Sequence, residues 1–375
     1  MIINKPPMGW NSWNTFGAEI NEELIMEMAD KIVELGYKDA GYDYIIIDDC
    51  WSEMKRNENG ELVCDKKKFP HGMKYISDYI HSKGLKFGMY TCVGVKTCAG
   101  YPSSFGYEFI DAKTFASWEI DYLKCDFGYF PFNADCKQIY KTMAMALQNS
   151  GRDILFSACN WGKHDSVKWM NSIGAHTYRS TGDIFDSFTS FRDIFVSQVK
   201  NLPYTSIGSY NDMDMLIVGM NGKGNVAQGG CTEEEYKSHF ALWCLFQSPL
   251  IIGADIRNLD DFAKNLLLNK ELIKINQDSA ARPCQLVYDA NGIWYSFIKE
   301  LSDGDYILAY FNASDEETQG QIFFYDIGLP VYSKVGLEMT DLFTGESLGV
   351  VTESYTPTLA PHCCKIYRAK FVDLP

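Results

Sequence analysis

The chain has 375 residues, of which 46% are hydrophobic, and its 34 basic and 49 acidic side chains give a net charge of −15 at pH 7. This length exceeds that of most single hydrophobic cores, so two domains are expected. The negative charge repels phosphate backbones and anionic membranes, and no apolar run approaches the roughly 20 residues that span a bilayer. Neither nucleic acid nor a membrane is therefore an expected partner, and the sequence leaves the oligomeric state open.

The cysteines bear on the cellular compartment. Twelve cysteines are scattered singly except for Cys363 and Cys364, without a CxxC pair or a regular framework. This pattern predicts reduced, mostly buried thiols, and residues 1–10 contain no apolar core of a signal peptide. The cytoplasm is the expected location, although a secreted chain that has lost its signal peptide would have the same sequence.

Residues 1–280 repeat one pattern, in which a helical segment ends at a glycine and a short apolar strand follows. In the first copy, Asn21 caps a helix with apolar residues at 3.6-residue spacing, and Gly36 ends it. The second helix ends in the same way at Gly84. Strands are expected at residues 8–13, 42–49, 85–91, 120–126, 153–159, 175–183, 203–212 and 248–255.

Eight apolar strands that alternate with helices predict a parallel sheet covered on its outer face, which closes as a (β/α)8 TIM barrel. An open doubly wound sheet is the alternative, but no GxGxxG follows the first strand. After residue 280 the segments become short, aromatic and β-branched, with turn signals between them. Residues 1–280 are thus predicted to form a catalytic barrel, and residues 281–375 an antiparallel β-sandwich.

In such a barrel, chemistry is expected where the strands end. Lys124 and Asp126 lie two residues apart on one strand, so both side chains should point into the mouth of the barrel. At about 4 Å, such a pair attracts by roughly 4 kcal/mol and keeps the carboxylate ionised, as a nucleophile must be. A purely structural ion pair is the alternative interpretation.

Other strand ends supply further polar groups. Asp183 follows Arg179 and would give the second carboxyl group that glycoside hydrolysis requires, unless it only caps a helix. Asp48 and Asp49 are adjacent acceptors that match neighbouring sugar hydroxyls, and they could equally bind a divalent cation. Apolar faces for a pyranose ring are available from three tryptophans, Trp13, Trp51 and Trp161.

Metal ligands are less well represented. The 6 histidines show neither HxH nor HExxH spacing. Asp212 and Asp214 are the best remaining oxygen ligands, and bracing of a loop is the preferred role for them. Neither a metal nor a cofactor is expected.

Several long motifs occur in order between residues 5 and 280. They are "PPMGWNSWNTF", "IIIDDCW", "KFGMYTCVGVKTCAGYPSSFGY", "DYLKCD", "ACNWG", "YRSTGDI", "NDMDML", "SPLIIGADIR" and "INQD". Together they resemble the motifs of glycoside hydrolase family 27, the melibiases or α-galactosidases, in the same order. The later "LAPHCCKIYR" resembles that family's C-terminal domain.

The resemblance implies a retaining exo-hydrolase that removes terminal α-galactosyl units, with Asp126 as nucleophile and Asp183 as general acid and base. A raised pKa for Asp183 and a lowered pKa for Asp126 would separate these two roles. The resemblance also implies that Asp48 and Asp49 bind galactose O4 and O6, and that Lys124 and Arg179 lie near O3 and O2. The walls of the implied sugar site are formed by Trp13, Tyr90, Trp161 and Met215.

Three departures from the family pattern limit what the resemblance implies. Asn160 replaces a Glu that many members have beside the C2 substituent, so an α-N-acetylgalactosaminidase remains an alternative. Gly128 stands where the family has the disulfide partner of Cys98, so no equivalent disulfide is expected. Met213 replaces a usual proline, which should alter loop rigidity more than chemistry.

Three further classes of function remain in view. A sugar-binding barrel without catalysis should lack a carboxylate, yet Asp126 and Asp183 are both present. A metal-dependent lyase or isomerase would need His and Glu ligand sets that the chain does not show. A β-L-arabinopyranosidase acts on a sugar without the hydroxymethyl group, and retention of Asp48 and Asp49 argues instead for a site that holds O6.

Overall fold

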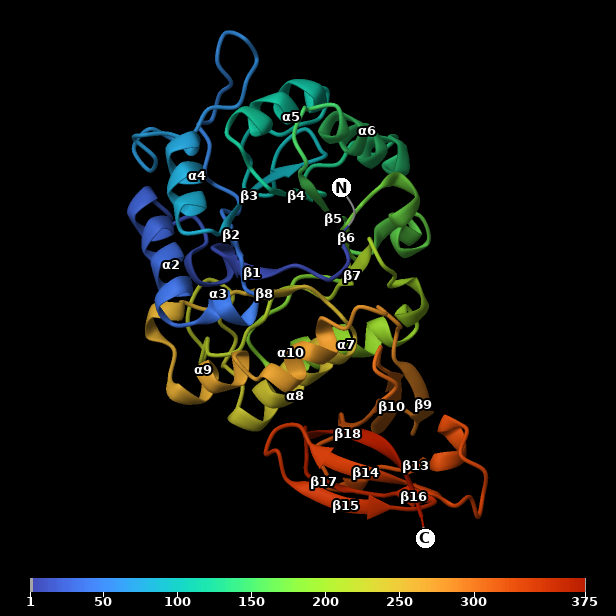
Figure 1. Ribbon diagram of the computed structural model, residues 1–375. Coiled ribbons are helices and arrows are strands. Elements are labelled where there is room, and N and C mark those ends of the chain that lie inside the picture. The colour runs from blue at the N-terminus through green and yellow to red at the C-terminus, as the bar shows by residue number, and fades with distance from the viewer. Residues whose placement is uncertain (1–2, 375) are drawn as a thin grey trace.

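The computed structural model describes residues 3–374 as a barrel followed by a separate β-rich domain (Figure 1). Eight strands of one parallel sheet surround the barrel axis. Seven fall within the predicted segments, and the third ends at Cys92, one residue beyond its predicted segment. They are β1 (Met8–Asn11), β2 (Tyr44–Ile46), β3 (Lys86–Cys92), β4 (Tyr122–Asp126), β5 (Leu155–Cys159), β6 (Thr177–Arg179), β7 (Tyr210–Asp212) and β8 (Leu250–Ile252).

The sheet closes on itself through a residue that follows β7. Its order is β7-β6-β5-β4-β3-β2-β1-β8, so each strand from β1 to β6 neighbours the next along the chain, and β1 pairs with β8. Leu216 lies four residues beyond Asp212, and its N–H donates to the carbonyl of Ile251 at 2.8 Å. In return, the N–H of Gly253 donates to the carbonyl of Leu216 at 2.9 Å. The prediction of a TIM barrel is therefore confirmed.

Helices cover the outside of the barrel, as the helix–strand repeat requires (Figure 1). The Asn21 side chain accepts the N–H of Leu24 at 2.8 Å and so caps the helix that follows, as predicted. The helices are α1 (Trp13–Phe16), α2 (Glu22–Glu34), α3 (Tyr37–Ala40), α4 (Met73–Ser82), α5 (Glu108–Ser117), α6 (Cys136–Gln148), α7 (Phe188–Val199), α8 (Glu233–Leu245), α9 (Asp261–Leu267) and α10 (Lys270–Asn276). Among these helices, none combines the length and the apolar composition that crossing a membrane requires.

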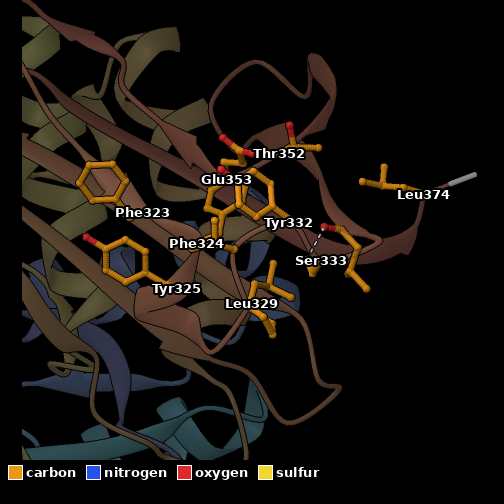
Figure 2. A pocket seen from close by; sticks show the side chains of 12 residues that line it. Phe323, Phe324, Tyr325, Leu329, Tyr332, Ser333, Thr352, Glu353 and Leu374 are labelled. Carbon is orange, nitrogen blue, oxygen red and sulfur yellow. Dashed lines mark hydrogen bonds between the residues drawn. The ribbon is translucent and has the colours of Figure 1, made fainter.

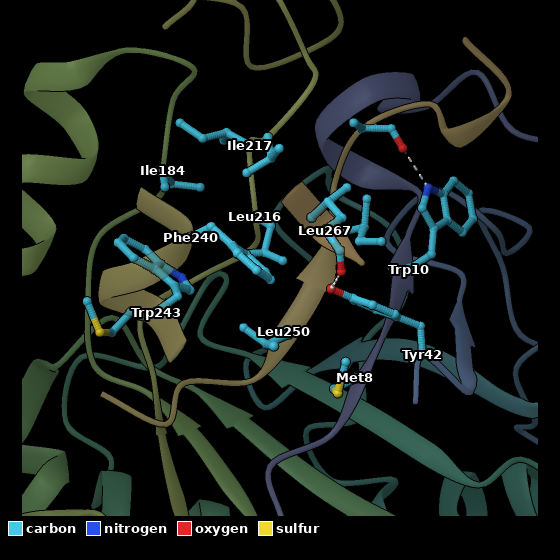
Figure 3. Close-up of a cluster of buried hydrophobic side chains, with 14 of the residues drawn as sticks. Met8, Trp10, Tyr42, Ile184, Leu216, Ile217, Phe240, Trp243, Leu250 and Leu267 are labelled. Atoms are coloured by element: carbon cyan, nitrogen blue, oxygen red, sulfur yellow. Dashed lines mark hydrogen bonds between the residues drawn. The ribbon is translucent and has the colours of Figure 1, made fainter. Parts of the chain in front are cut away.

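Buried side chains tie the first strand to the end of the barrel (Figure 3). The indole N–H of Trp10 donates to the carbonyl of Ala254 at 2.9 Å, and the Tyr42 hydroxyl donates to the carbonyl of Leu267 at 2.8 Å. Both rings are fully buried, so each hydrogen bond satisfies a polar group that would otherwise be costly inside an apolar core. The first contact ties β1 to the segment that follows β8, and the second ties the segment before β2 to α9.

The C-terminal domain is an antiparallel β-sandwich, as predicted. Its larger sheet has the order β15-β14-β18-β11-β10-β9, and two short strand pairs, β12-β17 and β13-β16, lie outside it. The strands are β9 (Gln285–Asp289), β10 (Trp294–Glu300), β11 (Tyr306–Asn312), β12 (Thr318–Gln319), β13 (Ile322–Phe323), β14 (Val335–Asp341), β15 (Ser347–Val351), β16 (Ser354–Tyr355), β17 (Thr358–Leu359) and β18 (Cys364–Asp373).

The segment QIFFYDI, residues 321–327, has the aromatic and β-branched composition of a strand but forms only a short one. Of residues 321–327, only Ile322 and Phe323 pair as a strand, and the next four residues form a 3-10 turn. The carboxylate of Asp326 accepts the N–H of Phe323 at 3.2 Å, a local contact that competes with strand pairing.

Aromatic rings join the sandwich to helix α7 of the barrel. Phe195 meets Tyr295 and Phe311 edge to face, with ring centroids 5.2 and 5.0 Å apart. His362 stacks on Phe188 at 3.5 Å, and its Nδ1 lies 2.7 Å from a carboxylate oxygen of Glu235. The domain boundary at residue 280 stays a prediction.

Candidate active site

Polar strand ends meet around one cavity of about 160 Å³ inside the barrel domain. This is the arrangement that the carboxyl ends of parallel barrel strands produce. The cavity brings together ten of the eleven predicted site residues, and Asn160 is the exception. The lining residues are Trp13, Asn14, Asp48, Asp49, Tyr90, Cys98, Lys124, Asp126, Trp161, Arg179, Asp183, Ile184, Phe185, Asp214, Met215, Asn225 and Val226.

Asp126, at the end of β4, is held by three donors. Its Oδ1 accepts the N–H of Phe127 at 2.8 Å, and its Oδ2 accepts the Tyr90 hydroxyl at 3.0 Å. The thiol of Cys98 approaches the same Oδ2 at 3.6 Å. The side chain is only 7% exposed, so these donors fix a nearly buried carboxylate at the cavity wall.

The partner predicted for Lys124 is wrong. Its ammonium group lies 2.8 Å from the Asp48 carboxylate, just beyond the end of β2, which is separated from β4 by β3. No pair of Lys124 with Asp126 within 4.0 Å occurs in the described chain. The long lysine side chain reaches across the barrel mouth to Asp48, which also accepts the Asn11 amide at 2.8 Å. Burial alone would lower the pKa of Lys124, but Asp48 and then Asp126 raise it well above its usual range.

Asp183 is paired with Arg179 and lies at the outer part of the site. The guanidinium Nη2 of Arg179 bonds Oδ1 of Asp183, and its Nη1 lies 3.0 Å from Asp214. Burial raises the pKa of Asp183, but the charge and hydrogen bond of Arg179 outweigh that effect and lower it. The expected raised pKa is therefore wrong for this conformation. The Asp183 side chain is 64% exposed, so it is able to exchange protons with solvent, in contrast to Asp126.

Asp48 and Asp49 lie side by side, and each is 2% exposed. The carboxylate of Asp49 accepts the N–H of Ala99 at 2.9 Å and that of Cys50 at 2.7 Å. Burial raises the pKa of Asp49, and these backbone donors oppose the rise. Two oriented carboxyl groups on one wall are well suited to accept hydrogen bonds from neighbouring sugar hydroxyls.

Two residues that the sequence suggested for the site, Asn160 and Trp51, are not among those that line the cavity. Asn160 is fully buried, and its amide donates to the carbonyl of Lys163 at 2.7 Å. Trp51 is buried too, and its indole N–H donates to the carbonyl of Tyr90 at 2.9 Å. Trp161 does line the cavity, in a left-handed backbone conformation (φ 57°) that turns it away from the course of its strand. Trp13, Tyr90 and Met215 complete the predicted walls.

Several lining residues were not predicted to be part of the site. The sequence assigned Asp214 a bracing role, which is confirmed, because its Oδ2 accepts the N–H of Ile184 at 2.8 Å. Asp214 also faces the cavity. Asn225 and Val226 reach the site because their N–H groups donate to the carbonyls of Thr15 and Asn14, each at 3.1 Å. Loop residues so distant in sequence carry no pattern that predicts this contact.

The charge of the cavity restricts what it binds. Its lining holds five carboxyl groups (Asp48, Asp49, Asp126, Asp183, Asp214) and two cations (Lys124, Arg179), an excess of three negative charges when all are ionised. Such a site disfavours anionic substrates and stabilises positive charge that develops in a transition state, as in cleavage of a glycosidic bond.

A second cavity, of about 320 Å³, lies in the C-terminal domain (Figure 2). Aromatic and aliphatic side chains dominate it, and the rings of Phe323 and Tyr325 stack at 5.1 Å. Glu353 is the single carboxyl side chain among its lining residues. It therefore lacks the paired carboxyl groups and the cations that line the barrel cavity.

Comparison with known proteins identifies the family. A sequence profile described as alpha galactosidase A matches residues 5–278, and one described as the alpha galactosidase C-terminal beta sandwich domain matches residues 292–369. The chain belongs to the melibiase family. Melibiases are glycoside hydrolases, so the chain is an enzyme of that class.

Similar melibiases occur in plants, bacteria and fungi. The alpha-galactosidase of Cyamopsis tetragonoloba is 41% identical over 365 residues, which cover 96% of this chain and 85% of that protein. Alpha-galactosidase A of Cellvibrio japonicus is 43% identical over 326 residues, 84% of this chain and 78% of that protein. The crystal structure of alpha-galactosidase I from Mortierella vinacea superposes with a TM-score of 0.91 at 34% identity, covering 99% of this chain and 98% of that one.

Proposed function

We propose that this chain is a retaining, exo-acting α-galactosidase that hydrolyses terminal α-linked galactose from oligosaccharides or glycoconjugates. The observation that carries the proposal is the presence of Asp126 and Asp183 on one small cavity, with Lys124, Arg179 and the Asp48–Asp49 pair beside them. Two carboxyl groups in unlike environments, one buried and one exposed, are suited to unlike roles.

The reaction proceeds in two displacements. A carboxylate oxygen of Asp126 attacks the anomeric carbon while Asp183 donates a proton to the glycosidic oxygen, which leaves as an alcohol. The Asp183 carboxylate then accepts a proton from water, whose oxygen attacks the anomeric carbon and breaks the ester to Asp126. Each step inverts the anomeric carbon, so the product retains the α configuration.

The remaining lining residues position the sugar. The Asp48 and Asp49 carboxylates accept hydrogen bonds from O4 and O6, and Lys124 and Arg179 donate to O3 and O2. The faces of Trp13, Tyr90 and Trp161, together with Met215, contact the apolar faces of the ring. Support for a single terminal unit comes from the cavity volume of about 160 Å³, which leaves little room for a longer chain.

Two related specificities compete with galactose. An α-N-acetylgalactosaminidase would need space beside C2 of the sugar for the acetamido group. The substrate of a β-L-arabinopyranosidase has no hydroxymethyl group that Asp48 and Asp49 could bind. Asn160 prompts the first alternative in the sequence, yet its amide is occupied by the carbonyl of Lys163. We therefore expect Asn160→Glu to leave the ratio of the two C2 specificities unchanged.

The proposed function is tested by measuring turnover of p-nitrophenyl α-galactoside, its α-N-acetylgalactosaminide and p-nitrophenyl β-L-arabinopyranoside. We expect α-galactoside to have the highest kcat/KM, and both Asp126→Ala and Asp183→Ala to lose most of that activity. Glu353→Ala, in the C-terminal cavity, is the matched control. Preference for either alternative substrate, or activity of the wild-type level in either aspartate variant, would overturn the proposal.

We also propose that the enzyme works in a reducing compartment, the cytoplasm. All twelve cysteines lie within residues 3–374, and all are free thiols, ten of them buried. Free thiols persist where glutathione and thioredoxin keep them reduced.

A further inference from the structure

We propose that Cys92, Cys98 and Asp126 bind one thiophilic divalent cation, Zn²⁺ in particular, and that this cation inhibits the enzyme by occupying the nucleophile. The site rests on two thiols that the proposed hydrolysis does not use. The inhibitory part of the proposal rests on the proposed function, whereas binding of the cation does not.

The three ligand atoms already have suitable spacing. The two sulfur atoms and a carboxylate oxygen of Asp126 all lie within 4.8 Å of one another. A tetrahedral Zn²⁺, with bonds of about 2.3 Å to sulfur and about 2.0 Å to oxygen, separates adjacent sulfur and oxygen ligands by about 3.5 Å. The distance from Cys98 Sγ to Asp126 Oδ2 is 3.6 Å, so this edge of the tetrahedron needs almost no rearrangement.

The surroundings of the thiols favour a soft cation. Cys92 is fully buried beneath the Tyr90 hydroxyl, 3.2 Å from its sulfur, while Cys98 is exposed and lines the cavity. A cation therefore reaches the site through the substrate cavity, whose excess of carboxyl groups attracts positive charge. Two thiolates and one carboxylate are a ligand set that selects Zn²⁺ over Mg²⁺ or Ca²⁺, and water would complete the fourth position.

The absence of a cysteine at position 128 keeps these thiols available. Gly128 packs directly on the segment that carries Cys98, and a Cβ atom at Gly128 would lie 2.9 Å from the Cys98 sulfur. A cysteine there would be close enough to compete for Cys98 as a disulfide partner. With glycine at this position, Cys98 has the thiol of Cys92 as a neighbour within 4.8 Å.

Occupation of the site has a direct kinetic consequence. Asp126 Oδ2 receives its hydrogen bonds from Tyr90 and Cys98, and a cation bound there would withdraw that oxygen from the anomeric carbon. Cation and substrate then exclude each other. Zn²⁺ should raise KM in proportion to its concentration and leave kcat unchanged, with reversal by EDTA.

The experiment is calorimetric titration of Zn²⁺ into the reduced, EDTA-treated full chain, in parallel with Co²⁺ absorption spectroscopy. We expect one bound ion per chain and a thiolate-to-Co²⁺ charge-transfer band. Cys98→Ser and Cys92→Ser should each weaken Zn²⁺ binding at least about 100-fold, because a hydroxyl replaces a soft ligand. Cys231→Ser, which alters a thiol outside this cluster, is the matched control and should bind as the wild type does.

The outcomes separate this inference from the proposed function. The proposed site would be overturned if Cys98→Ser bound Zn²⁺ as tightly as the wild type does. It would also be overturned if the wild type bound Mg²⁺ as tightly as Zn²⁺. Absence of Zn²⁺ binding by an active, reduced enzyme would overturn it too, and would leave the α-galactosidase proposal intact. Conversely, a Co²⁺ thiolate band in a chain without α-galactosidase activity would support the ligand set while the proposed function fails.

Discussion

The barrel cavity and the C-terminal cavity differ in size and in chemistry. The barrel cavity, of about 160 Å³, has five carboxyl groups and two cations, whereas the C-terminal cavity, of about 320 Å³, has one carboxyl group among aromatic rings. What distinguishes the barrel is that parallel strands deliver polar residues to one end, while the antiparallel sheet spreads its polar residues over both ends.

The largest expected effect comes from removing the buried carboxylate of the barrel cavity. Asp126→Ala should lower kcat/KM for p-nitrophenyl α-galactoside by at least about 10³-fold, because no other group forms the covalent intermediate. Steady-state kinetics of Asp126→Ala and Glu353→Ala, with circular dichroism to check folding, make the comparison between cavities. Equal losses in the two variants would contradict the distinction.

Removing the exposed carboxyl group should have an effect that depends on the leaving group. Asp183→Ala should slow hydrolysis of a galactosyl oligosaccharide by about 10²–10⁴-fold, the usual contribution of a general acid. A 2,4-dinitrophenyl galactoside needs little protonation, so its first step should be far less affected. Azide should restore turnover of this variant more readily than that of Asp126→Ala. An equal loss for good and poor leaving groups would argue against the general-acid role.

The pair of Arg179 and Asp183 predicts the direction of the pH dependence. Asp183 must be protonated to act as an acid, and Arg179 lowers the pKa of Asp183, so kcat/KM should fall as pH rises from the acidic side. Arg179→Gln should raise the pKa of Asp183 and move this basic limb upward by about one pH unit or more. Arg179→Lys keeps the charge and should move it less. If the basic limb of the kcat/KM profile lies at the same pH in the wild type, Arg179→Gln and Arg179→Lys, the titrating group is not Asp183.

A smaller effect, on stability, is expected at Asp212, the last residue of β7. Burial, and then the charge of Asp214, raises the pKa of Asp212 to about 6. Because the pKa of Asp212 is higher in the folded chain than in the unfolded chain, ionisation of this carboxyl group destabilises the fold. The destabilisation is fully present above about pH 6 and is absent below the pKa of the unfolded chain. Asp212→Asn should therefore stabilise the protein at pH 7.5 by about 1–3 kcal/mol, with the gain vanishing near pH 4.

Thermal unfolding at the two pH values measures this difference. Asp261→Asn is the control, because the side chain of Asp261 is 98% exposed. A gain for Asp212→Asn that is the same at pH 4 and pH 7.5 would show that the buried charge is not its cause.

The smallest effect is expected in the C-terminal cavity. Tyr332 is 89% exposed and lines this cavity (Figure 2), and it is not among the residues that line the barrel cavity. Tyr332→Ser should change kcat/KM for α-galactosides by less than about twofold, since surface changes away from a site usually have little effect. Kinetics with both p-nitrophenyl α-galactoside and an oligosaccharide check this. A selective loss with the oligosaccharide would mean that the two cavities share the substrate.

The sequence predicted the barrel and the meeting of its polar strand ends because both follow from regular spacing. A repeat of helix and strand fixes the closed sheet, and Asp48, Asp126 and Asp183 then reach one end of it regardless of side-chain detail. The choice of partner depends on that detail. Lys124 was paired in the prediction with a residue on its own strand, and its reach across the barrel selects Asp48 instead.

Backbone conformation and loop contacts set the remaining limits of prediction. Asn160 and Trp161 are adjacent, yet the left-handed conformation of Trp161 places only the tryptophan on the cavity. Nothing in the alternation of the strand predicts that reversal. Asn225 reaches the site through a backbone contact with Thr15, more than two hundred residues earlier in the chain. Such contacts depend on tertiary packing, which local patterns do not encode.

The central claim is that Asp126 forms the covalent bond to galactose. The most direct test is to incubate the enzyme with 5-fluoro-α-galactosyl fluoride, which slows release of the intermediate, and to map the labelled peptide by mass spectrometry. We predict one fluorogalactosyl group per chain, attached to Asp126. A label on any other residue, or α-galactoside turnover that gives the inverted β-anomer by NMR, would contradict the account.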